Sequence, residues 1–129
     1  MTGQQALTMA CNMLAEANGG SDIPDSFIDR APYLLAAFCG EARVIDERYR
    51  EAFSLGDQPA FDRSFIGLSD RLPLCDRLAP TAAIYLAATL LIDEAPALSE
   101  TFAERCRESL AEAYGEIPAT LHSITDVYS

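Results

Sequence analysis

The chain has 129 residues, a length that suits one domain and leaves little room for two. Half of the residues are hydrophobic and 22% are charged, which is typical of a globular protein rather than a disordered one. Acidic residues outnumber basic ones by 20 to 9, the formal net charge is −11, and all nine basic residues are arginine. Because phosphate backbones and anionic lipids attract positive surfaces, this balance argues against a free-standing nucleic-acid-binding protein and against docking on anionic membranes.

The first helix is predicted to begin almost at the start of the sequence. Thr2 is followed three residues later by Gln5, which is the pattern of a capping box. Apolar side chains then repeat at helical spacing until the glycine pair at 19–20, which is expected to end the helix.

A second, longer helix is predicted after Pro24. Its apolar residues recur at steps of three and four and define one expected buried face: Phe27, Ala31, Leu34, Leu35, Phe38, Ala42, Ile45, Tyr49 and Phe53. Pro32 is expected to kink this helix or to follow a short separate turn, because proline lacks a backbone donor. The charged residues of the segment are expected on a solvent-exposed face: Glu41, Arg43, Asp46, Glu47, Arg48, Arg50 and Glu51.

The segment 54–71 is predicted to be a long connection, because it contains two glycines, a proline and several Asp and Ser residues. It also carries four apolar side chains that could either fold back on the core or contact a partner: Phe61, Phe65, Ile66 and Leu68.

The third helix is predicted to start within 73–76 and to end at Ile92. The segment 78–92 contains no charge, yet it is shorter than the roughly 20 residues that a membrane span needs, so we expect a central core helix and no span. Its alanines, among them Ala83 and Ala87, are small enough to let another helix approach closely, either in the bundle or in a second subunit.

The fourth helix is predicted to start within 94–99, with Pro96 in its first turn, and to end at Gly115. Its expected buried face consists of Leu98, Phe102, Cys106, Leu110, Ala113 and Tyr114. The residues 119–129 mix β-branched and polar side chains and are predicted to form an extended arm or a short strand. The sequence therefore predicts an all-α, single-domain bundle of about four helices that covers residues 1–129.

Residues for catalysis or metal binding are sparse in the sequence. The four cysteines form no close pairs of the kind zinc sites use, and His122 is the only histidine. The start of the chain lacks the features of a secretory leader, so we expect free thiols in a reducing cytoplasm. With no nucleotide-binding or nucleophile motif either, we expect no enzyme activity, no cofactor and no small-molecule ligand, although a small helical enzyme or ligand carrier would only need a pocket with convergent polar groups.

Three parts of the sequence, taken in order, resemble a known family. They are the amphipathic segment from Phe27 to Arg50, the segment 72–80 with the alanine-rich helix that follows it, and the acidic turn at 93–94 followed by a last helix and the ending Ile124-Thr-Asp126-Val127-Tyr128. Over about 100 residues this order resembles the small helical head–tail connector or DNA-packaging proteins of tailed phages and prophages. In that family the ending is often followed by proline, whereas this chain has Ser129.

The resemblance implies an all-helical structural protein that assembles between the portal and the tail, in the bacterial cytoplasm during assembly and in the virion if the prophage is active. It implies contacts with copies of itself and with portal or tail proteins, and no sequence-specific contact with nucleic acid. The residues expected at such contacts are Phe61, Phe65, Ile66, Leu68, Ala83, Ala87, Ile124, Asp126, Val127 and Tyr128. A second possibility is a bacterial adaptor or toxin-neutralising module whose acidic surface meets a basic partner.

Overall fold

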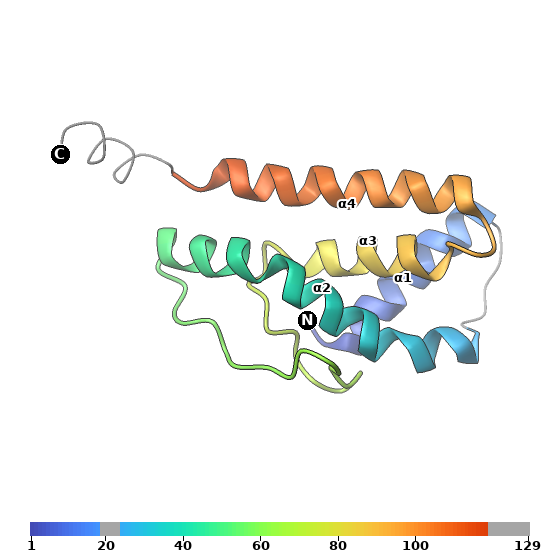
Figure 1. Cartoon of the computed structure of the whole chain (residues 1–129), viewed down its shortest axis with the longest axis horizontal. Coiled ribbons are helices and arrows are strands. Elements are labelled where there is room, and N and C mark those ends of the chain that lie inside the picture. Colours follow the sequence, from blue (N-terminus) through green and yellow to red (C-terminus); the bar gives the residue numbers. More distant parts are fainter. Residues whose placement is uncertain (19–23, 119–129) are drawn as a thin grey trace.

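The computed structural model describes residues 1–18 and 24–118. Its four helices are α1 (Gly3–Asn18), α2 (Asp25–Ala52), α3 (Ala79–Leu90) and α4 (Pro96–Glu116), and these described residues form no strand. Helix α3 contacts each of the other three helices, and α4 runs along its length (Figure 1). The prediction of an all-helical fold with four helices is confirmed, whereas the predicted arm at 119–129 lies outside the described residues.

The start of α1 is fixed by the capping box that the sequence predicts. The Gln5 backbone N–H donates to Thr2 Oγ1 at 3.2 Å, and the Thr2 backbone N–H donates to Gln5 Oε1 at 2.8 Å. The residues beside this cap are also tied to the long connection, because the Gly3 and Gln4 N–H groups donate to the carbonyls of Asp70 and Leu68. The first turn of α1 is therefore held from two sides.

Helix α2 is one continuous helix that contains Pro32, so no separate turn precedes this proline. The ribbon of α2 bends along its length (Figure 1). Helix α2 ends where Ser54 adopts a left-handed conformation, with φ of 54°. The Leu55 N–H then donates to the Arg50 carbonyl at 2.9 Å, which is the bond that closes a Schellman-type helix end.

Helix α3 begins at Ala79, later than the start predicted within 73–76. The residues just before it form a turn, in which the Cys75 carbonyl accepts the N–H groups of Leu78 and Ala79. Pro80 consequently lies in the first helical turn, where its missing backbone donor costs no hydrogen bond. The four leucines of the segment 78–92 are buried in the core, namely Leu78, Leu86, Leu90 and Leu91.

Helix α4 starts at Pro96 and ends within one residue of the predicted position. Phe102, Cys106 and Ala113 are buried as expected, whereas Tyr114 is 53% exposed, because it lies about 100° around the helix from the buried Ala113. Phe53, which follows the last residue of α2, is 44% exposed, so these two residues of the predicted apolar faces lie outside the core.

Candidate functional site

The polar centre of the molecule is Asp46, a residue that the sequence pattern places on the solvent-exposed face. The structure corrects this, because Asp46 is fully buried. Its Oδ2 atom accepts hydrogen bonds from Arg50 Nε and from Gln58 Nε2, both at 2.8 Å. Its Oδ1 atom accepts the backbone N–H of Cys75 at 2.6 Å. One carboxylate therefore joins α2, the long connection and the turn before α3.

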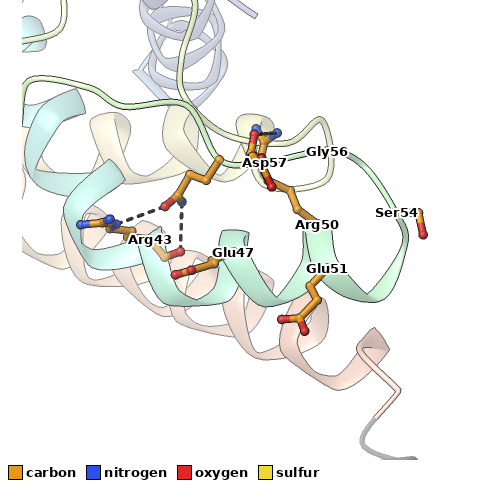
Figure 2. A pocket seen from close by; sticks show the side chains of 8 residues that line it. Arg43, Glu47, Arg50, Glu51, Ser54, Gly56 and Asp57 are labelled. Carbon is orange, nitrogen blue, oxygen red and sulfur yellow. Dashed lines mark hydrogen bonds between the residues drawn. The ribbon is translucent and has the colours of Figure 1, made fainter.

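Gln58 completes this arrangement, which we call the Asp46 clip and define as Arg43, Asp46, Arg50, Gln58 and Cys75. Arg43 Nε donates to Gln58 Oε1 at 3.1 Å, and Gln58 Nε2 donates to the Arg43 carbonyl, also at 3.1 Å (Figure 2). The side-chain amide of Gln58 thus forms hydrogen bonds with both the side chain and the backbone of Arg43. The connection is fastened to α2 at this point by charge-assisted bonds that are partly shielded from water.

Two open depressions flank the clip. The first has a volume of about 510 Å³ and is lined by Arg43, Glu47, Arg50, Glu51, Ser54, Gly56, Asp57 and Gln58 (Figure 2). The second, about 520 Å³, lies inside the connection, where the segment 59–66 faces the segment 70–74. Arg50 borders both depressions, but its Nε atom is already bound to Asp46. The Arg50 guanidinium therefore contributes to the stability of the fold through its bond to Asp46.

The cysteine thiols are held in their neutral form. Burial, with a smaller contribution from the charge of Asp46, raises the pKa of Cys39 to about 12. Burial likewise raises the pKa of Cys106 to about 11, and burial followed by a hydrogen bond to Asp46 raises that of Cys75. A thiolate is the reactive form, so these three cysteines behave as small core side chains.

Among Phe61, Phe65, Ile66 and Leu68, Ile66 is buried in the core and its N–H donates to the Pro32 carbonyl at 3.0 Å. Phe61 and Leu68 are partly buried against the same core. Phe65 is 44% exposed and stacks edge-on against Tyr33, with 5.3 Å between ring centroids. Three of these four side chains therefore fold back on the bundle, and Phe65 alone of the four keeps a large exposed surface.

Ala83 and Ala87 were expected at an interface, and the structure places both inside the core of this chain, fully buried. The close helix approach that small side chains allow is used between α3 and its neighbours in the bundle. The other expected contact residues, Ile124, Asp126, Val127 and Tyr128, lie outside the described residues.

A second polar network ties the end of α4 to the turn before α3. Arg77 donates to both oxygens of Glu116, with an Nη2–Oε2 distance of 2.7 Å and an Nε–Oε1 distance of 3.0 Å. The Tyr49 hydroxyl adds a longer bond to Glu116 at 3.4 Å. The hydrogen bonds from Arg77 hold the pKa of Glu116 below its ordinary value, and the bond from Tyr49 adds to this effect.

The low pKa of Glu116 gives a testable pH dependence. Because the folded pKa is depressed, the network stabilises the fold above the ordinary pKa of glutamate, and this stabilisation is lost as the pH falls through the lower folded value. We expect NMR titration of the Glu116 side-chain carboxyl to give a midpoint below the ordinary glutamate value. In an Arg77→Ala variant the midpoint should rise toward that value, whereas an unchanged midpoint would mean that Arg77 does not hold the carboxylate.

Within residues 1–18 and 24–118, no group of three or more His, Cys, Asp or Glu side chains is placed to hold a metal ion. No helix in the same residues is long and apolar enough to cross a membrane. Every buried side-chain nitrogen or oxygen of the described part has a hydrogen-bond partner. The buried polar groups are thus used up in holding the fold together.

The exposed surface carries the remaining features that could recognise another molecule. Several large apolar side chains are at least 39% exposed: Ile28, Tyr33, Val44, Phe53, Leu55, Phe65, Ile92 and Tyr114. Leu55 and Phe53 follow each other closely where α2 passes into the connection, and the Phe53 ring lies on Tyr49 with centroids 4.6 Å apart. The exposure of an apolar residue cannot be read from the composition, so the sequence did not identify Leu55 or Val44 as exposed apolar residues.

No protein-family profile, curated protein or solved structure matches this chain.

Proposed function

We propose that the chain is a non-enzymatic structural protein of a tailed phage or prophage particle, of the head–tail connector type, which acts by protein–protein assembly. The order of sequence segments that resembles that family suggests the role. The observation that carries the proposal is a contrast within residues 1–18 and 24–118: the buried side-chain nitrogens and oxygens are all paired, whereas Phe53 and Leu55 are exposed on the surface. Exposed apolar side chains that lie close to each other, as Phe53 and Leu55 do in the sequence, are characteristic of surfaces that bind other proteins.

In this proposal the partners are portal or tail proteins and further copies of the chain. The residues Phe53, Leu55 and Phe65 contribute apolar contacts, and the core alanines of α3 do not. Assembly takes place in the bacterial cytoplasm, and the protein remains in the virion where the prophage is active.

The proposal predicts that the chain joins a portal protein of the same phage or prophage. Mixing the two proteins is expected to give a complex that light scattering detects, and Leu55→Asp should weaken it by roughly tenfold because a charge enters the apolar contact. Ala97→Asp is the matched control, since Ala97 is exposed at the start of α4, and it should leave the complex unchanged. A chain that never joins portal or tail proteins would contradict the proposed function.

One observation favours the alternative role of an adaptor or toxin-neutralising module. Exposed acidic residues occur at every fourth position of α4, which aligns them along one ridge: Glu100, Glu104, Glu108 and Glu112. Arg107 bridges the first two, at 3.1 and 2.6 Å. A ridge of this kind suits a basic partner, and capture of a basic toxin or nuclease in place of virion proteins would favour this role.

A further inference from the structure

Helix α2 presents an apolar seam that stays largely exposed, although the Phe65 ring of the connection contacts one end of it at Tyr33. The seam consists of Tyr33, Ala37, Gly40 and Val44, whose spacing of four, three and four residues is that of a coiled-coil contact. Tyr33 is 60% exposed and Val44 is 58% exposed, and Ala37 and Gly40 between them are also exposed. The seam thus has larger side chains at its two ends, Tyr33 and Val44, and small residues, Ala37 and Gly40, in its middle.

Gly40 has no role in the packing of its own chain. A Cβ atom built on Gly40 would meet nothing within 4 Å, so a larger residue would fit there. Glycine in the interior of a helix is also less favourable than alanine, since it leaves the unfolded backbone more freedom. A residue that weakens the helix and that the bundle does not need is explained if another helix crosses closely at this point.

The seam fits a second, antiparallel copy of itself. When the two-fold axis passes between positions 38 and 39, Ala37 lies opposite Gly40 of the second copy, and Tyr33 lies opposite its Val44. The larger side chains, Tyr33 and Val44, thus contact each other at both ends of the interface. The small residues, Ala37 and Gly40, meet where the two helices cross. This is the self-complementary arrangement that a two-fold interface requires.

Charge supports the same register. One turn beyond Tyr33, the exposed Arg30 comes level with Glu47 of the second copy, and the two-fold symmetry repeats this pair. Glu47 borders the first depression, which Glu51 and Asp57 line together with Arg43 and Arg50, so the incoming guanidinium pairs with Glu47 itself (Figure 2). The pairing of oppositely charged Arg30 and Glu47 matters because each chain has a net charge of −11, and the resulting repulsion opposes association through most other faces.

We propose that two copies of this chain associate through the seam, with their α2 helices antiparallel and crossing at Ala37 and Gly40. The dimer does not rest on the proposed phage function, because a two-fold pair is complete with two copies and needs no portal or tail protein. A single helix pair lies at the small end of specific interfaces, so the dimer is expected to be reversible.

Sedimentation equilibrium of the full chain tests the dimer. The wild-type chain is expected to pass from monomer to dimer as its concentration rises to roughly 0.5 mM. Gly40→Leu should weaken dimerisation at least tenfold, because the added side chain separates the helices. Gly115→Leu is the matched control, since Gly115 is also an exposed helical glycine with open space around it, and its dimerisation should equal that of wild type.

Charge reversal tests the register. Either single variant, Arg30→Glu or Glu47→Arg, places like charges opposite each other at both symmetry-related 30–47 pairs and should weaken the dimer several-fold. The double variant restores opposite charges at both pairs and should restore dimerisation. Circular dichroism would establish that each variant is folded. A chain that stays monomeric overturns the proposal and leaves the seam to a helix of another protein. A dimer unaffected by Gly40→Leu, or a double variant no tighter than the single ones, overturns it equally.

Discussion

Replacing Asp46 with alanine is expected to lower the free energy of unfolding by about 3–5 kcal/mol. The substitution removes the acceptor for three donors at once, namely Arg50 Nε, Gln58 Nε2 and the Cys75 N–H. The guanidinium of Arg50, whose side chain is only 13% exposed, would lose the charge that neutralises it. A buried donor without an acceptor retains the full cost of its lost hydration. Urea denaturation monitored by circular dichroism measures this loss.

Glu47→Ala is the matched control for Asp46→Ala. Glu47 is the next residue in the same helix, but it is exposed, so its removal should change the free energy of unfolding by less than about 0.5 kcal/mol. Equal effects of the two substitutions would contradict the central role of Asp46.

Limited trypsin digestion adds a local readout to the unfolding measurement. Trypsin cleaves after arginine and lysine, and the chain contains no lysine. The cleavage sites within the connection are therefore Arg63 and Arg71. Asp46→Ala should accelerate cleavage at both sites more than Glu47→Ala does, because the clip no longer fastens the connection to α2.

The second large effect is expected at Ala87. Leucine at this position inserts three carbon atoms into a site with no exposed surface, and overpacking of this kind costs about 1–3 kcal/mol. Thermal unfolding of Ala87→Leu should show a clearly lower midpoint. If Ala87 instead lay at an interface between subunits, the same change would leave the isolated chain stable and weaken only its association.

Ala111→Leu is the control for the change in side-chain size. Ala111 lies on the exposed face of α4, so leucine there meets water and should alter stability by less than about 0.5 kcal/mol. A similar loss in both variants would point to the helical propensity of leucine rather than to packing.

Features set by neighbouring residues could be predicted from the sequence. The capping box of Thr2 and Gln5 depends on two residues three positions apart, and the position of Pro80 in a first turn follows from its missing N–H. The periodic apolar face of α2 is equally local, because it reflects the helical repeat alone. The four helices were accordingly predictable, with small errors at their ends.

Features set by distant contacts could not be predicted in this way. Asp46 and Arg50 are spaced like an ordinary exposed ion pair, and only the arrival of Gln58 and Cys75 buries the carboxylate. The third helix was predicted to start within 73–76, but residues 72–75 are buried without being helical and α3 starts at Ala79. Whether a small residue such as Ala87 faces its own bundle or a partner also depends on how the helices are placed, which a single helix pattern does not determine.

The backbone bonds at the start of α1 have a consequence for how the chain folds. The Met1 carbonyl accepts the N–H of Leu72, and Gly3 is bound to the Asp70 carbonyl, so the earliest residues pair with a segment beyond the whole of α2. These bonds cannot form until that segment has been synthesised and brought back, which closes a long loop at an entropic cost. The first helix is therefore expected to reach its final, protected state late in folding, after α2 and the connection have been joined at Asp46.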